Sequence, residues 1–292
     1  MSNKVSLLTI CPSRGRPGSI RALLEAWQET NAVAELLVVV DDDDPSLPEY
    51  LDLRSQVRIE VNSVARRLGP ILNAFAVPAA NNYDVIGFIG DDNRPRTPGW
   101  DSALTGGLAN HPGVAYGNDL IQGAKLPTSA VISASIIREL GYMCPPPVTH
   151  LFLDDFWRKL GEDVGCLLYF PDVIIEHLHP AVGKAQWDES YRQNNASNQY
   201  DADKAALQFF LQSQWPTDLT RLRERLELPD PGTLARFRER FLGEESSLGR
   251  LRERFLLAEP EKVKGIRRSL GVRRRAQGAT VCSYPRIPDT KE

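Results

Sequence analysis

The chain has 292 residues, of which 42% are hydrophobic and 25% charged, values that exclude a disordered or fibrous protein. No apolar run approaches the roughly 20 residues of a bilayer-spanning helix, so we expect no membrane span. The N-terminus shows no secretory signal pattern, and the four cysteines are widely spaced without a CxxC pair. Both observations favour reduced thiols and a cytoplasmic location, and they argue against a structural zinc site.

In chain order, residues up to about 185 alternate strand-like and helix-like segments. Short apolar runs predict strands at 5–10, 35–40, 56–62 and 84–90, as expected for strands covered on both faces. Apolar residues at helical spacing predict helices at 19–30, with Ser19 as N-cap, and at 68–80, interrupted near Pro78. This order predicts an α/β fold with a mostly parallel central sheet and flanking helices.

Polar clusters follow three of these predicted strands. They are CPSRGRP (11–17), DDDDP (41–45) and GDDNRP (90–95). Ligands of parallel α/β sheets bind beyond the carboxyl ends of the strands. We therefore expect the three clusters to meet at one edge of the sheet and to form a site there.

Asp91 and Asp92 end a buried strand, where unpaired carboxylates cost several kcal/mol. A neutralising partner is therefore expected: an arginine, water at an exposed turn, or a metal ion. Mg²⁺ and Mn²⁺ prefer oxygen ligands and often link one or two carboxylates to substrate phosphates. Asn93 then either ligates through its amide oxygen or orients a ligand. The alternative is an Asx-type turn, in which Asp91 caps backbone amides before Pro95.

Two further motifs lie downstream. The segment HLFLDDFW places Asp154 and Asp155 at the start of an amphipathic helix, where carboxylates also serve as simple helix caps. The segment LLYFPDVIIEHLHP predicts a strand that ends in His177 and His179. At positions i and i+2, the two imidazoles project from the same face, which makes them candidate metal ligands.

The C-terminal region has a different composition. Residues 216–292 contain 18 Lys and Arg against 12 Asp and Glu, whereas residues 1–215 contain 17 against 26. One pattern, Leu-x-Arg-[Leu/Phe]-Arg-Glu-Arg-[Leu/Phe], recurs at 219–226, 234–241 and 248–255. It predicts amphipathic helices packed on the body or on a second copy of the chain. The alternative is a phosphate-binding surface, since arginine suits bidentate phosphate contacts.

The motifs TICPSRGRP, VVVDDDDP, FIGDDNRPRTPGW, FLDDFW and EHLHP, in this order, resemble those of a nucleotide-sugar-dependent glycosyltransferase. The chain is similar to the GT-A fold, family 2 type, over about residues 4–190. The resemblance implies a Rossmann-like catalytic domain at 1–200. The repeats and basic composition of the rest of the chain predict an Arg-rich helical region at 201–292 with a loosely ordered tail. It also implies transfer of a sugar from a nucleoside diphosphate sugar, with UDP favoured, to a hydroxyl, with inversion and with Mn²⁺ or Mg²⁺.

The resemblance also implies a role for each matching residue. The donor nucleotide would lie against Pro12, Ser13, Arg14, Arg16, Asp41, Asp42 and Asp91. The DxD-type motif and the histidines would supply the metal ligands Asp92, Asn93, His177 and His179. Asn93 departs from the commonest form of that motif. Asp155 would be the general base, with Asp154 beside it. Separately, the segment 117–133 contains glycines and a proline, which suit a mobile flap over the donor.

Two other functional classes remain open. A sugar-nucleotide nucleotidyltransferase is one, although the sequence lacks that family's GxGxR spacing and following lysine. A non-catalytic protein that binds carbohydrate or nucleic acid is the other. For a transferase, the acceptor candidates are a hydroxymethylated DNA base, which would be flipped out of the duplex, a virion protein and a polysaccharide. The Arg-rich C-terminal region is compatible with a polyanion such as DNA, and the three acceptor classes stay open.

Overall fold

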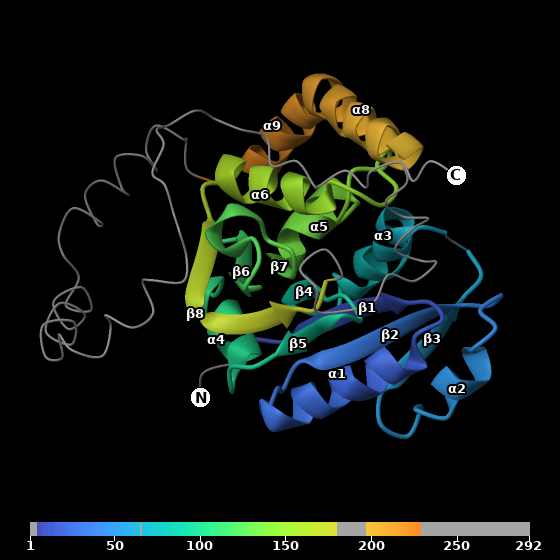
Figure 1. Ribbon diagram of the computed structural model, residues 1–292. Helices are drawn as coiled ribbons and strands as arrows, with labels where there is room; N and C mark the ends of the chain where they lie inside the picture. Colours follow the sequence, from blue (N-terminus) through green and yellow to red (C-terminus); the bar gives the residue numbers. More distant parts are fainter. Residues whose placement is uncertain (1–4, 65, 180–196, 229–292) are drawn as a thin grey trace, which may run out of the picture. The chain divides into compact units, whose positions relative to one another are not determined.

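The computed structural model describes residues 5–64, 66–179 and 197–228 (Figure 1). All of them belong to one of the two units into which the chain divides. The other unit, Pro229–Tyr284, lies outside the described residues, and so do the predicted repeats at 234–241 and 248–255.

Within the described residues, eight strands form one sheet in the order β3-β2-β1-β4-β7-β6-β8-β5. Strands β3, β2, β1 and β4 are mutually parallel, β7 is antiparallel to β4 and β6, and β8 is parallel to β6. The predicted α/β fold with a mostly parallel sheet is confirmed. The strands are β1 (Leu7–Ser13), β2 (Glu35–Asp41), β3 (Arg58–Asn62), β4 (Val85–Phe88), β5 (Asn93–Pro95), β6 (Val114–Asn118), β7 (Ala130–Ser133) and β8 (Leu167–His177).

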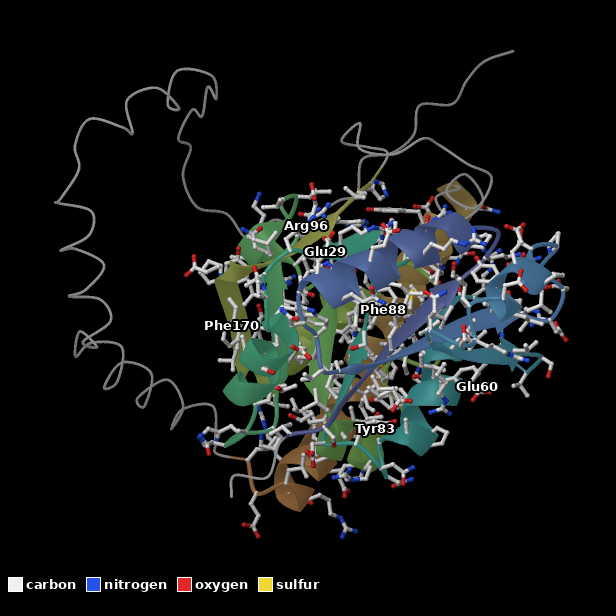
Figure 2. The ribbon with its side chains drawn as sticks, turned by 90° about the horizontal axis from the view of Figure 1, so that it is seen from below. Glu29, Glu60, Tyr83, Phe88, Arg96 and Phe170 are labelled. Atoms are coloured by element: carbon white, nitrogen blue, oxygen red, sulfur yellow. The ribbon has the colours of Figure 1, made fainter. Side chains whose placement is uncertain are left out.

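Burial along the strands follows their place in the sheet. Leu8 and Ile10 of β1 and Val38 of β2 are at most 1% exposed, because helices cover both faces of these inner strands. Strand β3 is at the edge and carries charge, with Arg58 paired to Glu35 and Glu60. Figure 2 shows Glu60 at the outer edge of the sheet and Phe88 within it. Charged side chains on an edge strand discourage pairing with another chain.

Helices cover the two faces of the sheet (Figure 1). Helices α1 and α4 share one face, where Trp27 and Trp100 pack edge to face with ring centroids 5.1 Å apart. Helices α3, α5 and α6 cover the other face. The described helices are α1 (Pro17–Glu29), α2 (Leu47–Leu51), α3 (Leu68–Ala79), α4 (Trp100–Gly107), α5 (Ala134–Leu140), α6 (Leu153–Asp163), α8 (Ser197–Ser213) and α9 (Trp215–Arg225), with a 3₁₀ turn, η1, at Gly123–Lys125.

The predicted cap at Ser19 is wrong. Helix α1 begins two residues earlier, at Pro17, whose fixed φ and missing N–H suit the first helical position. The residue before it, Arg16, accepts the backbone N–H of Ser19 with its carbonyl oxygen.

Helices α8 and α9 pack on α6 through aromatic side chains. Phe156 of α6 contacts Phe210 of α8 and Trp215 of α9, with ring centroids 5.9 Å and 5.2 Å away. Leu222, the central apolar residue of the repeat 219–226, is fully buried. This repeat therefore packs on the body, as one of its two interpretations predicts. None of the described helices is both long and apolar enough to cross a membrane.

Candidate active site

The loops after β1, β2 and β4 meet at one edge of the sheet. Arg14 Nη1 donates hydrogen bonds to Asp41 Oδ2 at 3.2 Å and to Asp43 Oδ1 at 2.6 Å. Ser13 Oγ donates to Asp91 Oδ2 at 2.6 Å. The predicted convergence of the three polar clusters is confirmed, because these bonds join the first cluster to both others.

The residues after β3 extend this edge. Arg66 Nη2 donates to Asp42 Oδ1 at 2.6 Å, and Arg66 Nη1 lies 3.4 Å from Asp41 Oδ1. Asn62 Nδ2 also donates to Asp41 Oδ1, at 2.6 Å. Sequence reasoning did not include Arg66 or Asn62, although an arginine pair directly after a predicted strand was a usable signal. The carboxylates of Asp41 and Asp42 therefore accept hydrogen bonds from guanidinium and amide groups.

The neutralising partner of Asp91 is an arginine. Asp91 is 6% exposed, and its Oδ1 lies 3.2 Å from Arg16 Nη1. Burial raises the pKa of Asp91 to about 6, and repulsion by Asp92 acts in the same direction. The charge of Arg16 and the hydrogen bond from Ser13 oppose that rise. Asp91 is thus a buried carboxylate that needs its cationic neighbour.

Tyr50 of α2 links this arrangement to the start of α1. Its hydroxyl accepts the backbone N–H of Arg16 at 2.7 Å and lies 2.8 Å from Ser13 Oγ. Because Ser13 donates its proton to Asp91, the Tyr50 hydroxyl donates to Ser13. Tyr50 is fully buried, and that burial raises its pKa, so it remains protonated. A tyrosine in a short helix belongs to no local motif, so sequence analysis did not select it.

Asp92 contacts one of the two predicted histidines. His177 Nε2 lies 3.2 Å from Asp92 Oδ2, and the rings of His177 and His179 are 5.2 Å apart. Burial lowers the pKa of His177, but the hydrogen bond and charge of Asp92 outweigh it, so the pKa is raised overall. Burial and the neighbouring His177 lower the pKa of His179. Strand β8 ends at His177, so His179 lies just beyond it.

Asn93 and Gly90 shape the acidic turn. Asn93 is 2% exposed, and its Oδ1 accepts the backbone N–H of Gly90 at 2.7 Å. A Cβ atom at Gly90 would lie 2.5 Å from Asp92 Oδ1 and 2.7 Å from Asn93 Oδ1. Only glycine therefore allows both side chains to fold this closely over the turn.

Arg94 lies beneath the same turn. Its Nη1 donates to the carbonyl oxygens of Asp91 at 2.8 Å and Asn93 at 2.6 Å, and the residue is 8% exposed. Burial lowers the pKa of this guanidinium, while Asp91 and Asp92 oppose the change. A second buried cation thus supports the acidic turn, and sequence reasoning did not include it.

The acidic pair stands in the first turn of α6, as predicted. Asp154 and Asp155 are 7% and 9% exposed. Among the described residues, Asp155 Oδ2 is buried with no hydrogen-bond partner, while Arg158 Nη2 lies 3.8 Å from Asp155 Oδ1. Burial and then the charge of Asp154 raise the pKa of Asp155 to about 7, and Arg158 opposes them. The charge of Asp154 also raises the pKa of His177, the residue that contacts Asp92.

Few candidate metal ligands lie close together in the described part of the chain. Among the described residues, no group of three or more His, Cys, Asp and Glu side chains is arranged to hold a metal ion. Asp92 and His177 supply two donor atoms 3.2 Å apart. Neighbouring ligands of an octahedral ion at 2.0–2.1 Å are about 3 Å apart, and Mg²⁺ is commonly held by one or two carboxylates together with substrate phosphates. The residues present therefore fit an ion shared with a phosphate ligand, not a closed protein cage.

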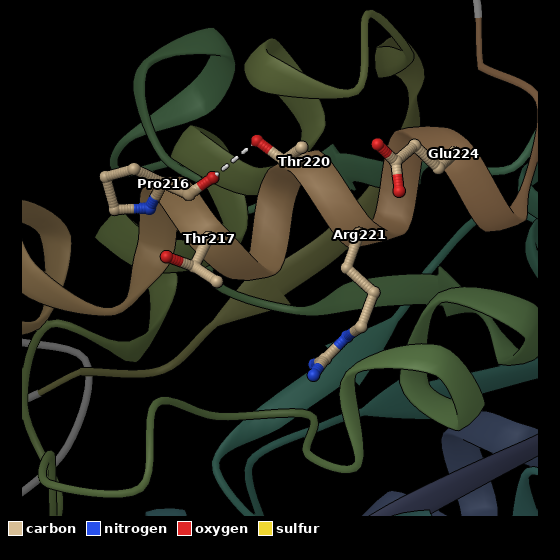
Figure 3. A pocket seen from close by; sticks show the side chains of 5 residues that line it. All are labelled: Pro216, Thr217, Thr220, Arg221 and Glu224. Atoms are coloured by element: carbon tan, nitrogen blue, oxygen red, sulfur yellow. Dashed lines mark hydrogen bonds between the residues drawn. The ribbon is translucent and has the colours of Figure 1, made fainter.

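A surface hollow lies elsewhere, on α9 (Figure 3). In it, Thr220 Oγ1 donates to the carbonyl oxygen of Pro216 at 2.9 Å, and Arg221 is paired with Asp218. The hollow contains none of the predicted site residues. It is lined by Pro216, Thr217, Thr220, Arg221 and Glu224.

No family model and no curated protein matches the chain. It is similar to the solved structure of S. aureus TarS 1-349 in complex with UDP, with 14% identity, a TM-score of 0.46 and 59% of each chain covered. The match spans 36% of a longer S. aureus TarS chain. Mannosyltransferase PcManGT from Pyrobaculum calidifontis in complex with GDP-Man and Mn²⁺ has 13% identity and a TM-score of 0.48, over 88% of this chain and 81% of that chain.

Glucosyl-3-phosphoglycerate synthase from Mycobacterium tuberculosis, in complex with phosphoglyceric acid, is another similar structure. It has 13% identity and a TM-score of 0.47, and the match covers 77% of this chain and 81% of that chain.

Proposed function

We propose that the protein is a glycosyltransferase that moves a sugar from a nucleoside diphosphate sugar to an acceptor hydroxyl with inversion. One observation carries the proposal: His177 contacts Asp92 at 3.2 Å, and its pKa is raised by both Asp92 and Asp154. Carboxylates from two clusters far apart in the sequence thus both act on the charge of one histidine. Such a transfer needs charge stabilisation at the leaving group and a base at the acceptor, on opposite sides of the sugar.

At the donor end, the residues of the sheet edge would bind the nucleotide. Arg14 and Arg16 supply positive charge for phosphate, and Pro12 and Ser13 end β1 beside them. Asp41 and Asp42 offer carboxylate oxygens to the N–H groups of a base, for which uracil is our preferred candidate. Asp91 keeps Arg16 in place through their ion pair.

Asp92 and His177, with His179 beside them, would hold a divalent ion. When bound, Mn²⁺ or Mg²⁺ supplies charge stabilisation for the departing diphosphate. For Asn93 we infer an orienting role, because its amide oxygen already accepts the N–H of Gly90. The assignment of Asn93 as a direct metal ligand is therefore the weaker of the two sequence-based alternatives.

At the acceptor end, Asp155 is the proposed general base. It takes the proton of the acceptor hydroxyl as that oxygen bonds to the anomeric carbon and the bond from that carbon to the diphosphate oxygen breaks. A pKa of about 7 suits this task, because the base is then available near neutral pH and still has affinity for a proton. Asp154 contributes by repulsion, which keeps that pKa high.

The acceptor remains one of three proposed classes: a hydroxymethylated DNA base, a virion protein or a polysaccharide. Contact with DNA would depend on the Arg-rich region 201–292, of which residues 201–228, with the first of the three repeats, are described. Two of its arginines are already engaged, Arg221 with Asp218 and Arg223 with the carbonyl oxygen of Asp163. Association of two copies through the C-terminal helices and a cytoplasmic location also remain proposals.

Nucleotide release tests the proposal. The protein is incubated with Mn²⁺ and UDP-glucose, UDP-GlcNAc or GDP-mannose, with and without each class of acceptor, and products are identified by mass spectrometry. We expect nucleoside diphosphate from at least one donor. Asp92→Asn and Asp155→Asn should abolish the release, and the exposed-residue control Glu224→Gln should not. Failure of every donor, or full activity in Asp92→Asn, would contradict the proposal.

A further inference from the structure

The C-terminal helices hold α6, which carries the acidic pair, at both of its ends. At the carboxyl end, Trp215 Nε1 of α9 donates to Asp163 Oδ2 at 2.7 Å. Arg223 Nη2 of the same helix donates to the carbonyl oxygen of Asp163 at 2.9 Å. These bonds fix the end of α6 that is farther from Asp154 and Asp155.

At the amino end, one carboxylate of α8 binds the segment that leads into α6. Asp203 is 2% exposed. Its Oδ1 accepts the backbone N–H of Thr149 at 2.9 Å and the Thr149 hydroxyl at 3.0 Å. Its Oδ2 accepts the backbone N–H groups of His150 at 3.0 Å and Leu151 at 2.8 Å, and Gln199 Nε2 at 2.9 Å. Asp203 thus binds three consecutive backbone amides.

Helix α3 holds the same segment. The backbone N–H of Gly69 donates to the carbonyl oxygen of Thr149 at 2.8 Å, and a Cβ atom at Gly69 would lie 2.5 Å from the carbonyl oxygen of Val148. Phe152 follows with a φ of 64°, in the left-handed region, and α6 begins at the next residue. The segment 148–152 is therefore fixed between α3 and α8.

We propose that Asp203 is a positioning residue of the active site: by binding the amides of residues 149–151 it sets where α6 begins and where Asp155 stands. The inference rests on the proposed function, in which Asp155 is the base. A carboxylate suits the position because it only accepts hydrogen bonds, and here it accepts five. The amide of an asparagine would direct N–H groups at N–H donors.

This role gives α8 an indirect part in catalysis, through the position of α6. The sequence places residue 203 in the helical region 201–292, outside the predicted catalytic domain. The described contacts make it the residue that anchors the acceptor-side carboxylates. A small displacement of a reacting group lowers a rate strongly, by about 100-fold for about 1 Å.

The test compares full-length Asp203→Asn with wild type and with Glu224→Gln, which alters an exposed carboxylate of α9. Hydrogen exchange followed by mass spectrometry reports the amides of residues 149–156. We expect the amides of residues 149–151 to exchange about 10-fold faster or more in Asp203→Asn, because one of the two oxygens that accept them is replaced by an NH₂ group. With the donor that wild type turns over, kcat for nucleotide release should fall about 10- to 100-fold while KM for the donor stays within about twofold. Thr149→Val removes the hydroxyl that donates to Asp203 Oδ1 and accepts from Gln199 Nε2. It leaves the three backbone hydrogen bonds to Asp203 in place, so it should show the same pattern more weakly, and it serves if Asp203→Asn does not fold.

Three results would overturn the inference: wild-type exchange at residues 149–156, wild-type kcat despite faster exchange, or a rise in donor KM as large as the fall in kcat. The last would indicate general loosening of the fold. The proposed function fails separately. If wild type releases no nucleotide from any donor, that function is contradicted, whereas faster exchange confined to residues 149–156 would still identify Asp203 as the group that holds the segment.

Discussion

At the residue scale, Asp155 combines burial with a weak countercharge. Its Oδ2 has no hydrogen-bond partner among the described residues, and Arg158 approaches its other oxygen only to 3.8 Å. Burial therefore raises the pKa of Asp155 more than the charge of Arg158 lowers it, and the pKa rises to about 7. A simple helix cap would be ionised well below neutral pH. The environment of Asp155 thus favours a base that titrates near the working pH.

The pH profile of nucleotide release should reflect this carboxyl group. A raised pKa means that the group is protonated below about 7, so kcat should fall as the pH is lowered through that value. Because Arg158 lowers this pKa, Arg158→Met should move the midpoint to higher pH, and Arg158→Lys should move it less. The measurement is kcat over roughly pH 5 to 9. An identical midpoint in wild type and Arg158→Met would contradict the assignment.

Gly90 permits a second residue-scale test. Because a Cβ atom there would lie 2.5 Å from Asp92 Oδ1, Gly90→Ala should displace the Asp92 side chain and weaken Mn²⁺ binding, measured by the EPR signal of the free ion. Gly106→Ala is the matched control, because the space around its Cβ position is open within 4 Å and the residue lies in α4. That change should leave Mn²⁺ binding unaltered and add up to about 1 kcal/mol of stability. Equal Mn²⁺ affinity in both variants would refute this role of Gly90.

At the element scale, the short helix α2 supports the donor edge through Tyr50. Tyr50→Phe would leave the buried backbone N–H of Arg16 without its acceptor, which we expect to lower the free energy of unfolding by about 1–3 kcal/mol. Because Ser13 and Arg16 hold Asp91, the affinity for UDP, measured calorimetrically with Mn²⁺ present, should fall as well. Tyr83→Phe, which removes a surface hydrogen bond to Glu35, is the control. UDP affinity unchanged in Tyr50→Phe would contradict the expectation.

The sequence predicted the elements whose local pattern is strong. Strands β1, β2 and β4 are apolar runs followed by polar clusters, so their type and the edge of the sheet that they share could be predicted. Strands β6 and β7 could not be predicted, because the glycines and proline of the segment 117–133 suggested a mobile flap. In the structure Gly117 lies within β6, and residues 130–133 form β7. A Cβ atom at Gly117 would meet the carbonyl oxygen of Val173 at 2.5 Å, so this glycine marks a close approach of two strands.

The residues of the site also divide into those that belong to a local sequence motif and those that only tertiary contacts bring together. Asp91, Asp92 and His177 belong to motifs that can be recognised over a few residues. Tyr50 and Asp203 reach the site through contacts with residues 34 and more than 50 positions away, and such tertiary contacts leave no local pattern.

At the scale of the whole molecule, the question is what the basic C-terminal region does. Helix α9 belongs to the packed body, because Trp215 is 3% exposed, Leu222 is fully buried and Asp218 accepts the hydroxyl of Tyr142 at 2.8 Å. Removal of residues from 216 onward would therefore damage the fold. A truncation after Leu228 preserves these contacts and removes most of the excess basic charge.

We expect the truncation after Leu228 to melt close to the full-length temperature, and one after Ser213 to lose stability because it removes Trp215 and Leu222 from the core. If DNA is the acceptor, full-length protein should bind duplex DNA with an affinity that falls steeply with salt, and the truncation after Leu228 should show a weaker slope. Fluorescence anisotropy over a salt series measures the DNA affinity and its salt dependence for both proteins. An unchanged slope would contradict a role of the C-terminal region in DNA binding.

The most direct test of the account is a crystal structure grown with UDP and Mn²⁺, in which anomalous scattering locates the manganese. We predict an anomalous peak beside Asp92 and His177, with the diphosphate of UDP at the edge formed by Ser13, Arg14 and Arg16. Manganese bound elsewhere, or UDP bound away from that edge, would contradict it.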